Sequence, residues 1–149
     1  MNKQRTALQK GFTLAELMAV IIIISILAAM ALGSYRKSLE RAHFSDGLMM
    51  AHAYAAAVDM YYYDHNNTLP ENLSSVAVSH STGGGYFTPT YTNGNTYVTA
   101  TRTGGNYQIR VYLESQANNP DECIGTDTAG KEFCELVGYK NCTDLTCRK

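Results

Sequence analysis

The stretch that decides the fold is Lys10-Gly-Phe-Thr-Leu-Ala-Glu-Leu-Met-Ala-Val-Ile-Ile-Ile-Ile-Ser-Ile-Leu-Ala-Ala-Met-Ala-Leu32, an apolar run with one carboxylate, Glu16, near its start. Phe12 to Leu32 is 21 residues long. At about 1.5 Å of rise per residue, a helix of that length spans roughly 30 Å, the thickness of a bilayer's hydrocarbon core. We therefore predict a helix that can cross a membrane.

The residues on the amino-terminal side of this run set its orientation. Met1 to Lys10 contains Lys3, Arg5 and Lys10 and no acidic residue, which is the positive-inside pattern for a helix whose amino end stays in the cytoplasm. An ordinary signal peptide has a shorter apolar core and a small-residue cleavage site after it. We expect the rest of the chain to be exported and the cleavage site to precede the apolar run.

The junction itself is a specific motif. Gly11 followed by Phe12-Thr13-Leu14-Ala15-Glu16 resembles the class III leader of type IV pilins and of the related pseudopilins. The resemblance implies that prepilin peptidase cuts after Gly11, that the new terminus at Phe12 is methylated, and that Glu16 stands at the family's glutamate position. The close match covers roughly the first quarter of the chain, and the remainder agrees in layout.

The carboxylate of Glu16 is costly in its setting. An ionised carboxylate in hydrocarbon costs roughly 3 kcal/mol on insertion scales, so it is expected to find a cation or to mark a functional site. Cleavage at Gly11 creates an α-amine at Phe12. This amine can pair with the Glu16 carboxylate of the same helix or of a packed neighbouring helix. Because a slipped neighbour would leave both charges unpaired, such pairing favours assembly in the correct register. The alternative is a hydrated Glu16 at the headgroup boundary.

Composition fits one exported subunit. The chain has 149 residues and a net charge of −1, and residues 12–149 carry nine basic against thirteen acidic residues, a net charge of −4. This balance gives no nucleic-acid signal. The length allows one domain. When the leader and the helix are subtracted, roughly ninety residues remain for a globular part, which can form only a small core.

All four cysteines lie in the last 27 residues, on the exported side: Cys123, Cys134, Cys142 and Cys147. Disulfides persist there, so we expect two. Their spacing lacks the Cys-x-x-Cys pair typical of structural zinc, and no histidine lies among them. Three pairings remain open, of which Cys123–Cys134 with Cys142–Cys147 is favoured because short loops close readily. In pilins, a disulfide commonly holds the carboxy-terminal region to the sheet.

The helical pattern continues beyond the apolar run. A stripe of residues recurs at spacings of four and three, namely Phe44, Leu48, Ala51, Ala55, Val58 and Tyr62, and predicts one buried helix face. The helix is expected to end near Tyr63, where Asp64-His65-Asn66-Asn67 and Pro70 break the pattern. Many type IV pilins carry a proline where Gly33 stands. Gly33 is compatible with local unwinding, because glycine costs about 1 kcal/mol in a helix, or with close helix packing.

Three β-rich segments follow: Tyr86–Tyr91, Thr96–Arg102 and Tyr107–Glu114. Asn93-Gly94 and Gly104-Gly105 separate them as hairpin turns, and Pro89 makes the first an edge strand at best. Tyr107, Ile109, Val111 and Leu113 share one face, which is expected to cover the helix stripe. The last cysteine-bearing segment contains a possible short strand at 132–137.

The predicted fold class is α+β, and the resemblance implies the pilin fold: a long amino-terminal helix packed on a small antiparallel sheet, with a disulfide-stapled carboxy-terminal region. The organisation has five parts: a leader at 1–11, a transmembrane and assembly helix at 12–33, its amphipathic continuation at 34–63, a helix-to-sheet loop with a possible first strand at 64–95, and the sheet with the cysteine-containing region at 96–149.

The sequence contains few residue patterns that are typical of catalytic sites. None of the four histidines (His43, His52, His65 and His80) neighbours a serine or cysteine in an activated-nucleophile motif, so we predict no enzyme and no cofactor. Pseudopilins of type II secretion systems bind calcium in a carboxy-terminal loop, and Asp121, Glu122, Asp127 and Glu132 offer oxygens in that region. Their spacing is not that of an EF-hand, and a solvated acidic tail without metal is the favoured interpretation.

Three functions remain in competition. The first, implied by the resemblance, is a type IV pilin held in the inner membrane as a single-pass precursor and polymerised into an extracellular filament for adhesion, motility or DNA uptake. Its implied partners are other copies of itself, prepilin peptidase, an inner-membrane assembly platform, the membrane and minor pilins. The second is a pseudopilin of a type II secretion system. The third is a membrane-anchored periplasmic binding domain that never polymerises, which leaves Glu16 and the Gly11–Phe12 junction without a role.

Overall fold

The computed structural model describes residues 12–78, 85–116 and 119–149. The expected leader, including Gly11, and part of the helix-to-sheet loop lie outside these residues. The chain divides into two compact units, residues 1–39 and residues 40–149. We describe each unit by itself.

Helix α1 (Leu14–Asp64) is the longest element and contributes to both units. It contains an 18-residue window with a mean hydropathy of 2.6, none of which is buried, so by length and composition it can cross a membrane. Its carboxyl end lies one residue beyond the predicted Tyr63. Asn66 and Asn67 follow with φ angles of 51° and 61°, a left-handed conformation that asparagine tolerates and that stops the helix.

In the second unit, the predicted helix stripe is confirmed from Phe44 to Val58, whereas Tyr62, its last predicted member, is half-buried and lies outside the core. Phe44, Ala51, Ala55 and Val58 are buried in the core, and Leu48 packs against it. The stripe is wider than predicted, because Met50 is also fully buried and Gly47 lies in contact with the ring of Phe87. A Cβ on Gly47 would approach that ring to 2.5 Å, so this glycine permits the close approach of helix and sheet.

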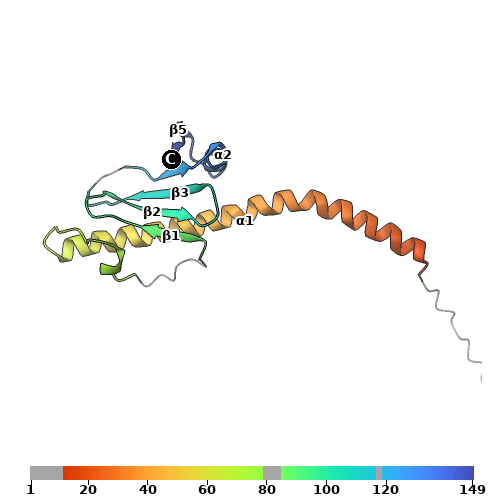
Figure 1. The fold of residues 1–149 in the computed structure, drawn as a ribbon, viewed down its shortest axis with the longest axis horizontal. Helices are drawn as coiled ribbons and strands as arrows, with labels where there is room; N and C mark the ends of the chain where they lie inside the picture. The colour runs from red at the N-terminus through yellow and green to blue at the C-terminus, as the bar shows by residue number, and fades with distance from the viewer. Residues whose placement is uncertain (1–11, 79–84, 117–118) are drawn as a thin grey trace, which may run out of the picture. The chain divides into compact units, whose positions relative to one another are not determined.

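In the second unit, the helix packs on a six-stranded antiparallel sheet in the order β1-β2-β3-β4-β6-β5. Figure 1 shows the first three of these strands side by side in this order. Its strands are β1 (Phe87–Thr90), β2 (Tyr97–Arg102), β3 (Tyr107–Tyr112), β4 (Glu122–Gly125), β5 (Asn141–Thr143) and β6 (Thr146–Arg148). The first three form the predicted meander. Strand β1, with Pro89, lies at an edge, as a residue without an N–H donor requires.

The two faces of the sheet differ in polarity. On β3, Tyr107, Ile109 and Val111 are buried in the core shared with the helix, whereas Gln108, Arg110 and Tyr112 alternate with them and are only half-buried. Leu113 follows the strand and is fully buried. The predicted assignment of faces is therefore confirmed, and so is the α+β fold class.

The predicted short strand at 132–137 is wrong. This segment lies in helix α2 (Thr128–Leu136), whose N-cap Asp127 accepts a hydrogen bond from the Gly130 N–H at 2.7 Å. Phe133 and Val137, four residues apart, both pack against the core, which is a helical spacing. The run was too short for its period to distinguish a strand from a helix.

Two disulfides fasten the carboxy-terminal region. Cys123 of β4 is bonded to Cys134 of α2, and Cys142 of β5 is bonded to Cys147 of β6. The first bond joins a strand to the helix that covers it, and both of its cysteines are fully buried. The second closes the β5–β6 hairpin. This is the pairing that short loops favour.

Candidate functional site

The exposed helix segment, residues 12–39, is the first candidate site. Every one of its residues is exposed in the chain by itself, and its apolar side chains include Phe12 at 82%, Leu14 at 75% and Met30 at 74% exposure. Burying a side chain of this size is worth about 1.5–3 kcal/mol. The segment therefore needs cover from outside the chain, which a bilayer or packed helices can supply.

Glu16 and Thr13 form a reciprocal cap at the start of α1. The Thr13 N–H and the Thr13 hydroxyl each donate to Glu16 Oε2 at 2.8 Å, and the Glu16 N–H donates to Thr13 Oγ1 at 3.2 Å. This capping box satisfies N–H groups that have no partner within the helix. The sequence carries the signature of this capping box, Thr13 followed three residues later by Glu16, in addition to the charge that singles Glu16 out. Its predicted role in assembly stays a prediction.

Gly33 lies within continuous α-helix, and a Cβ placed on it would meet no atom within 4 Å. Nothing in the described part of the chain packs against it. Its predicted flexibility is not tested by this conformation, and the close-packing alternative would require another molecule.

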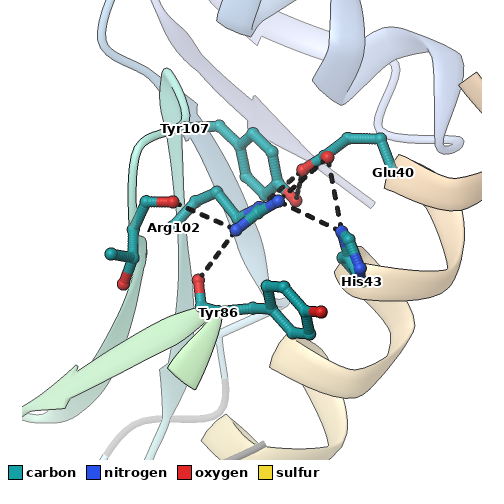
Figure 2. Close-up of polar contacts among 6 residues, drawn as sticks. Glu40, His43, Tyr86, Arg102 and Tyr107 are labelled. Atoms are coloured by element: carbon teal, nitrogen blue, oxygen red, sulfur yellow. Dashed lines mark hydrogen bonds and ion pairs between the residues drawn. The ribbon is translucent and has the colours of Figure 1, made fainter. Parts of the chain in front are cut away.

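The second candidate site is the Glu40 cluster, which we define as Glu40, His43, Tyr86, Arg102 and Tyr107 (Figure 2). Glu40 accepts from Arg102 Nε at 2.6 Å and from Arg102 Nη2 at 3.1 Å, a two-pronged contact between helix and sheet. The Tyr107 hydroxyl donates to the same carboxylate at 2.9 Å. Glu40, the first residue of the second unit, thus contacts side chains of two strands, Arg102 on β2 and Tyr107 on β3.

The remaining contacts hold the guanidinium of Arg102. Its Nη1 donates to the carbonyl oxygens of Tyr86 at 3.2 Å and Thr103 at 3.0 Å, and its Nη2 lies 3.1 Å from His43 Nδ1. The His43 ring stacks on the Tyr86 ring with centroids 4.1 Å apart. Planar, bidentate recognition of a carboxylate is the geometry for which arginine is suited.

The electrostatics follow from these contacts. The hydrogen bond from Arg102, opposed by partial burial and aided by Tyr107, lowers the pKa of Glu40 to about 2. Burial, together with the adjacent Glu40 charge, raises the pKa of Tyr107. Glu40 is therefore ionised and Tyr107 neutral at neutral pH, so a charge-assisted contact fixes residue 40 of the helix on the sheet.

The four acids considered for calcium do not converge. Asp121 lies 2.9 Å from His52, Glu122 is paired with Arg110 and Arg148, and Asp127 caps α2 and accepts from Asn106. Glu132 is exposed on α2. Instead of forming a solvated acidic tail, three of them have defined partners. Elsewhere in the described residues, Glu135 lies near Cys142 and Cys147, but these two sulfurs form a disulfide and provide no thiolate for a metal.

The comparisons with known proteins find matches in the amino-terminal part of the chain, which includes the exposed helix segment. Residues 7–32 match the family model described as the prokaryotic N-terminal methylation motif. The amino-terminal half of the chain is similar to type IV pilins. It is 47% identical over 75 residues to a fimbrial protein of Neisseria meningitidis serogroup A, which covers 50% of this chain and 44% of that protein.

Two further relatives give the same result. A type IV major pilin protein, PilE1, of Neisseria gonorrhoeae is 47% identical over 72 residues, 48% of this chain and 43% of the relative. The type IV major fimbrial protein FimA of Dichelobacter nodosus is 36% identical over 84 residues, 56% and 52% of the two chains. The matched regions thus span about half the length of these relatives. No solved structure matches the chain significantly.

The Glu40 cluster was missed by sequence reasoning. Glu40 and Arg102 are 62 residues apart, and only the strand register brings Arg102 to the helix. The sequence holds one weak signal: Arg102 is the last residue of β2, a strand along which buried and less buried residues alternate. No local pattern indicates which residue Arg102 contacts.

Proposed function

We propose that this chain is a structural pilin subunit that polymerises into a surface filament. The observation that carries the proposal is the exposed helix segment, which contains a run of membrane length and overlaps the match to the methylation motif at residues 7–32. From Leu17 to Leu32 this run is apolar except for Ser25. Within the precursor, the bilayer covers this segment. In the filament, the same segments of neighbouring copies cover one another, because a helix that leaves the membrane must keep its apolar surface away from water.

The processing steps follow from the motif. Prepilin peptidase removes residues 1–11 after Gly11 and Phe12 becomes the methylated terminus. Residues 12–33 then serve as transmembrane and assembly helix, 34–63 as its continuation on the sheet, 64–95 as the connection to the sheet, and 96–149 as the sheet and the disulfide-bonded region. The precursor is single-pass in the inner membrane, and its partners are its own copies, the peptidase, an assembly platform and minor pilins. The chain catalyses no reaction.

Glu16 has a defined task in this scheme. Its carboxylate caps the start of α1 in the chain by itself, and in the filament it pairs with the amine of Phe12, so that register errors leave charges unpaired. A pseudopilin of a secretion system would use the same chemistry. The names of the relatives, which are major pilins and fimbrial proteins, favour the pilin.

The test is the non-reduced intact mass of protein sheared from cell surfaces. We expect the loss of residues 1–11, the gain of one methyl group and the absence of four hydrogens through two disulfides. A Gly11→Val variant, which blocks cleavage, is expected to keep its full-length mass and to stay in the membrane. A full-length wild-type mass found only in membranes would return the chain to the anchored-domain alternative, and a processed form confined to the cell envelope would favour the pseudopilin.

A further inference from the structure

The turn between strands β1 and β2 presents an asparagine and a glycine to solvent. The Asn95 N–H donates to the Thr92 carbonyl oxygen at 3.0 Å, so Thr92 to Asn95 form a β-turn with Asn93 and Gly94 at its two central positions. Both central residues are exposed, and Gly94 has a φ angle of 88°. Neither the exposed helix segment nor the Glu40 cluster contributes to this turn.

The order of the two central residues gives them a specific chemistry. The backbone nitrogen of a residue that follows asparagine can attack the asparagine Cγ and close a five-membered ring. Asn93 is the one asparagine of the chain that precedes a glycine. Because glycine has no Cβ, the backbone at Gly94 can approach the Asn93 side chain closely, and even a Cβ placed there would meet no atom within 4 Å.

Both reacting groups are unengaged in the part of the chain that the structure describes. Among those residues, no hydrogen bond involves the Asn93 side-chain amide or the Gly94 N–H. No such bond therefore has to break before the nitrogen reaches Cγ. The two groups are also held in one turn, so their approach costs no translational freedom, and their exposure admits the water that a later hydrolysis needs.

Other asparagines lack this combination. The Asn72 side chain accepts from the Ser74 N–H at 3.0 Å, and Asn106 Nδ2 donates to Asp127 at 3.0 Å. Asn95 belongs to the same turn, but it is half-buried and precedes Thr96, whose branched Cβ crowds the backbone nitrogen. Asn93 is thus distinguished by both its neighbour and its surroundings.

We propose that Asn93 is a modification site at which the folded chain deamidates without an enzyme. The Gly94 nitrogen loses its proton to solvent and forms a bond to Asn93 Cγ, the Cγ–Nδ2 bond breaks, and ammonia leaves. Water then opens the resulting succinimide. Attack at the side-chain carbonyl carbon gives aspartate, and attack at the backbone carbonyl carbon gives isoaspartate. The net reaction consumes one water, releases one ammonia and neither oxidises nor reduces the chain.

Each conversion places a negative charge on the β1–β2 turn. Between Glu71 and Arg102 the sequence contains no Asp, Glu, Lys or Arg, so the new carboxylate would be the only acidic group of this hairpin. It is ionised at neutral pH, and the acidic residues of 12–149 rise from thirteen to fourteen against nine basic ones. The turn lies wholly within the second unit, so this reaction goes beyond the proposed filament function and does not depend on it.

The experiment uses the full-length folded chain in detergent micelles, incubated at pH 6 and at pH 8.5. Mass spectrometry of its peptides follows the replacement of NH2 by OH at each asparagine and separates aspartate from isoaspartate. We expect Asn93 to convert at least about tenfold faster than Asn72, Asn95 and Asn106, and faster at pH 8.5 because the deprotonated nitrogen is the nucleophile. Equal rates at the four positions, or no conversion of Asn93, would overturn the proposal.

Two variants locate the reaction. Asn93→Gln keeps the side-chain amide but adds one methylene, so attack must close a six-membered ring, and conversion at this position is expected to fall about tenfold or more. Asn95→Gln makes the same change two residues away and is expected to leave the conversion of Asn93 at the wild-type rate. Circular dichroism before incubation establishes that both variants fold. A folded Asn93→Gln chain that gains negative charge as fast as the wild type would refute the assignment.

Discussion

Apolar residues in the first part of helix α1 are exposed, whereas many of those in its second part are buried. In the exposed helix segment, side chains such as Leu14 and Met30 are at least 74% exposed, whereas Met50 and Val58 further along the same helix are fully buried. Intrinsic helix propensity does not distinguish the two parts. The difference is that residues 44–58 pack on the sheet of the second unit, whereas the described residues of the first unit, 12–39, are exposed.

Reversal of the Glu16 charge is the change with the largest expected effect on the first part. We expect Glu16→Lys to leave membrane insertion and leader cleavage intact and to reduce surface filaments below detection, because a lysine cannot pair with the amine of Phe12. Sheared-filament yield and electron microscopy measure this. Glu71→Lys, the same change on an exposed loop residue, is the control. Normal filaments from Glu16→Lys would refute the register argument.

In the second unit, the loss of a disulfide is expected to lower the free energy of unfolding most. A double Cys123→Ala, Cys134→Ala variant opens a link with a sequence separation of 11, and the Cys142–Cys147 link has a separation of 5. Loop entropy predicts losses of about 3 and about 2 kcal/mol respectively. Urea unfolding followed by the near-ultraviolet signal of the tyrosines tests the order. A larger loss from the shorter link would mean that loop entropy does not set the ranking.

The Glu40 cluster should make the stability of the second unit sensitive to acid. The pKa of Glu40 is about 2 in the folded chain against an ordinary value of 4.5, so its stabilisation is complete above pH 4.5 and is lost as pH falls toward 2. After allowance for partial exposure, we expect Glu40→Gln to lower the free energy of unfolding by about 2 kcal/mol at pH 7.

The control for this prediction is Glu132→Gln, which removes an exposed charge on α2. Urea unfolding at pH 7, 4.5 and 2 is the measurement. The gap between wild type and Glu40→Gln should close at pH 2, whereas Glu132→Gln should follow the wild type throughout. A gap that persists undiminished at pH 2 would contradict a role for the ionised carboxylate.

The two glycines of α1 provide the smallest and most direct comparison. Gly47→Ala places a Cβ 2.5 Å from the Phe87 ring and is expected to destabilise the second unit by about 1 to 2 kcal/mol. Gly33→Ala meets no atom within 4 Å, so it should favour the helix by about 1 kcal/mol and leave the urea midpoint of the second unit unchanged. Equal midpoints for the two variants would show that the Phe87 ring shifts freely.

Gly33→Ala also tests flexibility during assembly. If the helix must unwind near Gly33 as the filament forms, the alanine variant will yield fewer filaments despite an unchanged fold. A wild-type yield would favour the close-packing alternative only if a bulkier Gly33→Leu variant then blocked assembly.

Elements with a long, regular pattern were predictable. The stripe at Phe44, Ala51 and Val58 identified the buried helix face, and the alternation along Tyr107–Leu113 identified the core face of the sheet. Pro89 placed its strand at an edge. Helix α2, the four-residue strand β4 and the three-residue strands β5 and β6 were not predicted, because they are too short for a period to be read and depend on the Asp127 cap and on disulfide-linked neighbours.

The sequence by itself determined the membrane-length helix, the Gly11-Phe12 junction on which the predicted cleavage rests, and the lone charge of Glu16 within the apolar run, because each is a local property of consecutive residues. The tertiary structure alone decided that Glu40 meets Arg102, that Gly47 receives the Phe87 ring, and that Glu122 lies between two arginines. These contacts join residues between 12 and 62 positions apart. They arise only when strand register and helix packing are fixed together, which no local pattern specifies.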